Sequence, residues 1–83
     1  MKPTIGRVVI YNTTEADKAK MDAASKMYGD CNKQDKLPAI ITAVWGPTCV
    51  NLKIIADGYF DLWVTSANQG DQPMQWDWPI REE

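Results

Sequence analysis

Tryptophan is the residue type in this chain whose spacing most directly suggests a chemistry. Trp63, Trp76 and Trp78 all lie in the C-terminal third of the 83-residue chain. Trp76 and Trp78 flank Asp77, so in an extended segment both indoles point to one side and the carboxylate to the other. Such a pair can hold a planar group, since stacking a base on an aromatic ring contributes about 1–3 kcal/mol. The alternative is that the indoles fill the core of a small domain.

Hydroxyl, amide and guanidinium groups elsewhere in the chain could complete such a site. Hydroxyls near turns are neutral donors that can hold a phosphate, and a guanidinium matches a phosphate or a base edge. Turn capping, a structural hydrogen bond and a solvated surface arginine are the competing interpretations. The predicted ligand-binding residues are Arg7, Tyr11, Trp45, Thr48, Asn51, Trp63, Thr65, Ser66, Trp76, Trp78 and Arg81.

Several chemistries are excluded by what the chain lacks. It contains no histidine, which removes Ser-His-Asp triads, Cys-His pairs and zinc sites that mix His with Cys. Cys31 and Cys49 have no second pair, so free thiols are expected. The aspartates Asp57, Asp61 and Asp77 lack the spacing of a calcium site. We therefore expect a protein that is not an enzyme and that uses neither a metal nor a cofactor.

Charge and length restrict the partners. The chain has 9 basic and 11 acidic residues and no basic stripe, which argues against long nucleic acid as a ligand. Neither a secretion signal nor a long apolar run is visible, so we expect a soluble, intracellular protein without a membrane span. The 83 residues make one domain, 1–83, with a thin core. Homo-oligomerisation is therefore expected.

A helix is predicted near the N-terminus, inserted between strands. Residues 4–11 are rich in β-branched and aromatic side chains, which predicts a first strand. Asn12 and Glu15 have the spacing of a capping box, and alanines recur at near-helical spacing over about 15–28. The apolar face of this predicted helix is weak, so the helix is suited to cover the edge or end of a sheet. A polar loop follows over 29–37, and we interpret 13–37 as a helix and loop insertion.

The remainder of the chain indicates strands. Val50, Leu52 and Ile54 alternate with polar residues, the pattern of a half-buried strand. Asp57-Gly58 predicts a tight type I′ hairpin turn. The predicted strands are 39–45, 48–56, 59–66 and a short edge strand within 75–80. We therefore expect a mainly β fold, either a small SH3-like five-stranded barrel or an open antiparallel sheet, with one short inserted helix.

Several of these motifs also carry a family resemblance. In chain order they are Ile10-Tyr11, an Ala-Ile-Ile run ending in Val44-Trp45, Cys49-Val50-Asn51-Leu52, Asp57-Gly58, Thr65-Ser66 and Trp76-Asp77-Trp78-Pro79. Through these motifs the chain resembles a family of small phage- and prophage-encoded proteins. The resemblance covers nearly all of its length except 13–37. Many members have His where this chain has Asp77, so a role that needs an imidazole there does not carry over.

The resemblance implies a protein of the host cytoplasm that acts by stoichiometric sequestration. By analogy of size, origin and aromatic content, we expect an anti-defence sponge that binds a cyclic nucleotide signal of bacterial immunity. The indoles would stack on the bases while the hydroxyl, amide and guanidinium groups bind phosphates and base edges. The alternative is an SH3-like module that binds a host or virion protein to inhibit or recruit it.

Overall fold

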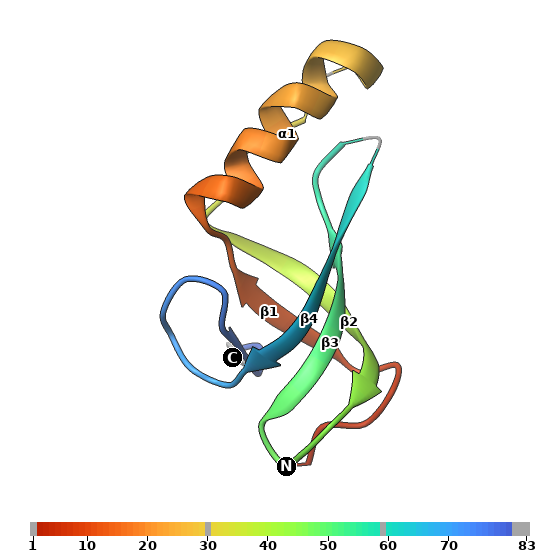
Figure 1. Cartoon of the computed structure of the whole chain (residues 1–83), viewed down its shortest axis with the longest axis vertical. Helices are drawn as coiled ribbons and strands as arrows, with labels where there is room; N and C mark the ends of the chain where they lie inside the picture. The colour runs from red at the N-terminus through yellow and green to blue at the C-terminus, as the bar shows by residue number, and fades with distance from the viewer. Residues whose placement is uncertain (1, 30, 59, 81–83) are drawn as a thin grey trace.

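The computed structural model describes residues 2–29, 31–58 and 60–80. One antiparallel sheet holds β1 (Val8–Asn12), β2 (Lys36–Val44), β3 (Cys49–Ile55), β4 (Asp61–Asn68) and β5 (Trp76–Asp77), in the order β4-β3-β2-β1-β5. The helix α1 (Glu15–Tyr28) lies between β1 and β2 in the chain and extends beyond one end of the sheet (Figure 1). The strands curl into a half-barrel, which confirms the mainly β prediction.

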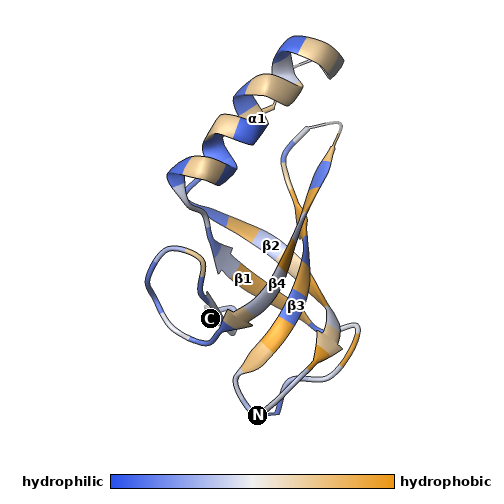
Figure 2. Ribbon diagram, in the orientation of Figure 1, coloured by the Kyte–Doolittle hydropathy of each residue, from blue (hydrophilic) through white to orange (hydrophobic). Residues whose placement is uncertain are grey.

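The core lies on the concave side of this sheet. The predicted alternation in β3 is confirmed in part: Val50, Leu52 and Ile54 are fully buried and Lys53 is exposed, but Asn51 is buried as well. Apolar residues follow the strands in Figure 2, whereas hydrophilic and moderately hydrophobic residues alternate along the helix. The first strand begins later than predicted, at Val8, because Gly6 has a φ of +93° and its N–H donates to the Ile41 carbonyl. Only a residue without a Cβ adopts that backbone conformation readily.

Trp76 closes the half-barrel at one end. Gln69 and Trp76 form a parallel bridge, and the Gly70 N–H donates to the Trp76 carbonyl at 2.9 Å. The Trp76 indole N–H donates to the carbonyls of Thr48 and Ala67, both at 3.1 Å. The last strand therefore contacts the far side of the sheet through its backbone and through one buried side chain.

The helix is capped by Thr14 and Asp17, not by the predicted capping box of Asn12 and Glu15. The Thr14 hydroxyl accepts from the Asp17 N–H at 3.0 Å, and the Asp17 carboxylate accepts from the Thr14 N–H at 2.9 Å. Asn12 cannot cap the helix because it is still part of β1, where its N–H donates to the Gln75 carbonyl. Met21 and Ala24 are the buried residues on the apolar side of α1.

The turn after β3 also differs from the prediction. The β3–β4 hairpin exists, but β3 ends at Ile55 and β4 begins at Asp61. A two-residue type I′ turn at Asp57-Gly58 is therefore wrong, and Tyr59 lies outside the described residues. Asp57 instead contacts the loop after the helix, accepting from the Asn32 N–H at 3.0 Å and from the Asn32 amide at 2.7 Å. A contact between segments distant in sequence has replaced the local turn.

Tyr11 and Asp17 join the first strand to the helix. The Tyr11 hydroxyl donates to the Asp17 carboxylate at 2.7 Å, and both residues are buried. Burial and the neighbouring Asp17 carboxylate both disfavour the phenolate, and they raise the pKa of Tyr11 well above its ordinary value. The phenol therefore stays protonated in the folded state at pH values where the unfolded chain loses that proton.

This raised pKa predicts an alkaline loss of stability. The unfolded tyrosine releases its proton near pH 10, and above that pH the free energy of unfolding falls by up to about 1.4 kcal/mol per pH unit. Below pH 10 the Tyr11 phenol does not make the free energy of unfolding depend on pH. Tyr11→Phe should flatten the alkaline slope in urea denaturation at successive pH values. Equal slopes for the two proteins above pH 10 would contradict the prediction.

Candidate functional site

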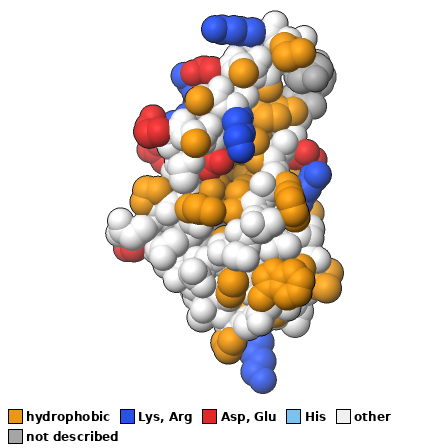
Figure 3. Space-filling view, viewed as in Figure 1, with side chains coloured by type: hydrophobic (Ala, Val, Ile, Leu, Met, Phe, Trp, Pro, Cys, Tyr) orange, Lys and Arg blue, Asp and Glu red, His pale blue; other side chains and the backbone are white. Residues whose placement is uncertain are grey.

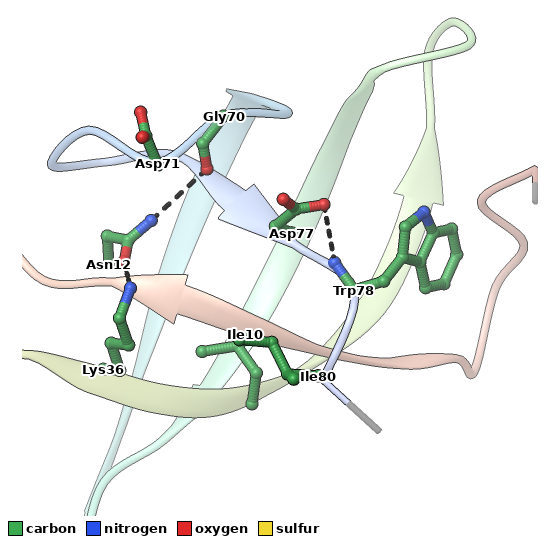
Figure 4. A pocket seen from close by; sticks show the side chains of 8 residues that line it. All are labelled: Ile10, Asn12, Lys36, Gly70, Asp71, Asp77, Trp78 and Ile80. Atoms are coloured by element: carbon green, nitrogen blue, oxygen red, sulfur yellow. Dashed lines mark hydrogen bonds between the residues drawn. The ribbon is translucent and has the colours of Figure 1, made fainter. Parts of the chain in front are cut away.

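A groove of about 400 Å³ lies along β1 and β5, with lining residues from both strands. Ile10 alternates with the buried Val9 and Tyr11, so its side chain faces outward, directly across from Asp77 on β5. Figure 4 shows the groove from close by, with polar side chains at one end and the Trp78 indole at the other. The lining residues are Ile10, Asn12, Lys36, Gly70, Asp71, Asp77, Trp78 and Ile80.

The polar end of the groove is held in place by the β1–β2 pairing. Asn12 and Lys36 are directly opposite each other in that pairing, and the Lys36 ammonium donates to the Asn12 side-chain carbonyl at 2.5 Å. The Asn12 amide N–H donates in turn to the carbonyls of Gln75 at 3.1 Å and Gly70 at 3.4 Å. This chain of hydrogen bonds fixes the position of a cation beside the groove.

Two carboxylates lie across the groove from Ile10 and Ile80 (Figure 4). The Asp77 carboxylate accepts from the Trp78 backbone N–H at 2.8 Å and from the Gln69 amide at 2.9 Å. Asp71 accepts from the Gln72 amide at 3.1 Å. A bound molecule would therefore meet one ammonium group, two acceptor carboxylates and an apolar wall.

Trp78 lies at the other end of the groove, in contact with two side chains. The Arg7 guanidinium is 5.3 Å from the centroid of the Trp78 ring, within the range of a cation–π interaction. The Trp76 and Trp78 rings are 5.4 Å apart and almost perpendicular, at 88°. The prediction that these two indoles sandwich a planar ligand is wrong, because the perpendicular rings already contact each other and Trp76 is fully buried.

Tyr11 and Trp76 were predicted to bind a ligand but are core residues. Their exposed fractions are 1% and 0%, so neither ring has a face open to a ligand. Both also use their polar atoms internally, Tyr11 toward Asp17 and Trp76 toward backbone carbonyls. The core interpretation of Trp76 is therefore the correct one.

Three other predicted residues meet in a second place. The Asn51 side-chain carbonyl accepts from the Trp45 indole N–H at 2.8 Å and from the Ser66 backbone N–H at 2.9 Å. The register of both β2–β3 and β3–β4 shifts beside Asn51, and Ser66 has a φ of +55°. Asn51 thus supports an irregularity in two strand pairings, which is the structural role that its sequence context left open.

The remaining predicted residues are dispersed. Thr48 provides its backbone carbonyl to the Trp76 indole, and Thr65 is exposed on β4. Trp63 is also exposed on β4, at the opposite end of the strand order from Trp78. Arg81 lies outside the described residues. Of the predicted set, Trp78 lines the groove and Arg7 stacks against it.

The sequence interpretation missed most of the groove. The sequence pattern indicates a helix cap at Asn12 and places the Asp77 carboxylate on the side opposite the two indoles. Lys36 carries no sequence signal of its own, because only strand pairing brings it to Asn12, which is 24 positions earlier in the chain. The signal that pointed to the groove was the Trp-x-Trp-Pro segment at the end of the chain.

The other predicted groups give the following results. Cys31 and Cys49 are free thiols, as expected, and burial together with Asp57 and Asp22 raises the pKa of Cys31. Within residues 2–29, 31–58 and 60–80, no group of three His, Cys, Asp or Glu side chains is arranged to hold a metal ion. The helix in this part of the chain is too short and too polar to cross a membrane.

No family model, no curated protein and no solved structure matches the chain.

Proposed function

We propose that this protein is a non-enzymatic binding protein that sequesters a small nucleotide signal, of the cyclic nucleotide class, in the groove beside Trp78. The observation that carries the proposal is the combination, in one groove of about 400 Å³, of an indole, two isoleucines and a fixed ammonium group. This volume lies within the range of about 300–1,000 Å³ typical of small-molecule sites. An apolar wall with a few placed polar groups is the usual composition of such sites.

The groups in the groove match the parts of a nucleotide. Trp78, Ile10 and Ile80 offer apolar surface to a base, and Lys36 offers N–H donors to a phosphate. The carboxylates of Asp71 and Asp77 accept hydrogen bonds from sugar hydroxyls or from the amino group of a base. Because two carboxylates accompany one lysine, donors on the bases and sugars would make more of the hydrogen bonds than the phosphates would.

Sequestration needs tight, slowly reversible binding and no bond cleavage. The chain lacks histidine, and the groove contains no hydroxyl or thiol nucleophile among its described lining residues. The resemblance to small phage-encoded proteins supports a role in the host cytoplasm against the nucleotide signals of bacterial immunity. In that role one protein molecule would remove one or more signal molecules from their receptor.

The proposal predicts that Trp78→Ala weakens ligand binding strongly. A thermal-shift screen with cyclic dinucleotides, cyclic trinucleotides and cyclic ADP-ribose isomers would first identify the ligand, since saturating ligand stabilises the folded state. Losing one stacking surface of about 1–3 kcal/mol should then raise Kd about 5- to 150-fold in calorimetry.

The matched control is Trp45→Ala, which removes an exposed indole outside the groove. Its Kd should stay at the wild-type value. No stabilisation by any compound in the panel, or equal weakening by the two variants, would contradict the nucleotide proposal.

A second candidate function is binding of an extended segment of a host or virion protein. It is favoured by a separate apolar surface at the end of β2, where Trp45 is 66% exposed and Val44 38% exposed. Val44 and Pro47 line a shallow pocket there together with Pro3. Aromatic surfaces on SH3-like barrels bind extended peptides. A stoichiometric polypeptide recovered from host lysate, and lost with Trp45→Ala but not Trp78→Ala, would favour this function.

A further inference from the structure

The strand β4 forms an open edge of the sheet. It is the terminal strand in the order, and among the described residues its segment 61–66 pairs with β3 alone. The closing contact with β5 is made beyond this segment, at Gln69. The helix α1 stands past the end of the sheet and does not run along β4 (Figure 1).

This edge has few of the features that usually prevent strand pairing. Exposed edges are normally protected by proline, by lysine, by inward-pointing charges or by bulges. The segment 61–66 reads Asp-Leu-Trp-Val-Thr-Ser, and its one charged residue, Asp61, lies at its start. That carboxylate is paired with Lys53 on the neighbouring strand at 3.4 Å. A bulge lies at the other end, where Thr65 and Ser66 are both opposite Asn51, so the regular part of the edge is 61–64.

Trp63 lies in the middle of this open segment with its side chain facing solvent. It is 61% exposed, while its neighbours Leu62 and Val64 are buried on the opposite side of the strand. Figure 3 shows apolar side chains open to solvent over the strands, whereas most of the charged side chains on that face gather around the helix. A large exposed indole on an unprotected edge is the surface that a second strand would cover.

We propose that β4 pairs in antiparallel fashion with β4 of a second copy of this chain, about a twofold axis at Trp63. The pairing would join the two five-stranded sheets into one continuous sheet, a symmetric association by strand addition. A second copy fits because an antiparallel edge is self-complementary in its backbone donors and acceptors.

The side chains of β4 favour this register over one centred on Asp61. With the axis at Trp63, the two indoles are directly opposite each other, and Asp61 is opposite Thr65 of the second copy. Aromatic cross-strand pairs are stabilising, whereas like charges directly opposite are destabilising. An axis at Asp61 would place the two carboxylates face to face. The groove beside Trp78 is formed by the other end of the strand order, so the dimer would carry two independent grooves.

Sedimentation velocity over a wide range of protein concentration tests this dimer. We expect the wild-type protein to reach twice the chain mass of 9.4 kDa and Trp63→Lys to remain at 9.4 kDa. The matched control is Val8→Lys, which introduces the same charge at a residue 52% exposed on β1. It should form the dimer as wild type does, and circular dichroism should show the same fold for all three proteins. A wild-type protein of single-chain mass throughout, or a Trp63→Lys protein that dimerises normally, would overturn the proposal.

Crosslinking tests the position of the axis. With Cys31 and Cys49 replaced by serine, Trp63→Cys should give a disulfide-linked dimer on mild oxidation, because opposite residues of paired strands have the separation a disulfide requires. Thr65→Cys in the same background should give no disulfide-linked dimer, since residue 65 of the second copy lies four strand positions away in this register. A crosslink at Thr65 equal to that at Trp63 would overturn the register. Nucleotide binding is measured separately, so failure of the dimer leaves the groove proposal unaffected.

Discussion

Replacing Trp76 by alanine is expected to lower the free energy of unfolding by about 3–5 kcal/mol, the range for a large aromatic residue removed from a core. Trp76 is fully buried and is the largest such side chain in the described core. Its indole N–H also binds the carbonyls of Thr48 and Ala67, which are left without that donor in the variant. Domains are stable by only about 5–15 kcal/mol, so this loss removes a large part of the total.

Trp78→Ala is the control for this prediction. Trp78 packs against the core but is only half-buried, so its loss should reduce stability less than the loss of Trp76. Urea denaturation followed by circular dichroism measures both variants without relying on tryptophan fluorescence. Equal losses for Trp76→Ala and Trp78→Ala would show that Trp76 does not hold the half-barrel closed as argued above.

Asp17→Ala is expected to lower the free energy of unfolding by about 2–4 kcal/mol. The Asp17 carboxylate accepts from the Tyr11 hydroxyl at 2.7 Å and from the Thr14 N–H at 2.9 Å. A hydrogen bond to a charged group contributes about 1.5–3 kcal/mol, and a buried donor left without a partner adds its desolvation cost. The substitution therefore weakens the helix start and leaves a buried phenol without its acceptor.

The matched control for Asp17 is Asp35→Ala. Asp35 is also an aspartate that binds a partner from another part of the chain, accepting from Lys18 at 2.6 Å, but it is exposed. Exposed ion pairs contribute little because water and salt screen them. Its urea midpoint should remain close to wild type while that of Asp17→Ala falls. Similar midpoints for the two variants would contradict the role assigned to the Tyr11–Asp17 contact.

The regular elements of this fold were predictable because their signals are local. Alternation at Val50, Leu52 and Ile54 predicts which side of a strand is buried whatever the strand pairs with. The helix limits 15–28 also agree with the structure, since repeated alanines before Gly29 favour a helix with any cap. The predictions that failed, the cap at Asn12 and the tight turn at Asp57-Gly58, concern residues whose polar groups have partners distant in sequence.

How far the candidate site could be predicted depended on the same difference between local signals and contacts distant in sequence. By itself, the sequence determined that the chain forms a small β-sheet with one helix, and it indicated the C-terminal Trp-x-Trp-Pro segment as part of the candidate site. Only the tertiary structure decided that Trp76 is buried while Trp78 borders a groove, because that choice follows from where β5 meets the end of β4. It also decided that Lys36 stands beside Asn12. Residue type and periodicity determine which side of a strand faces the core, whereas a groove is formed by side chains that only strand pairing and sheet curvature bring together.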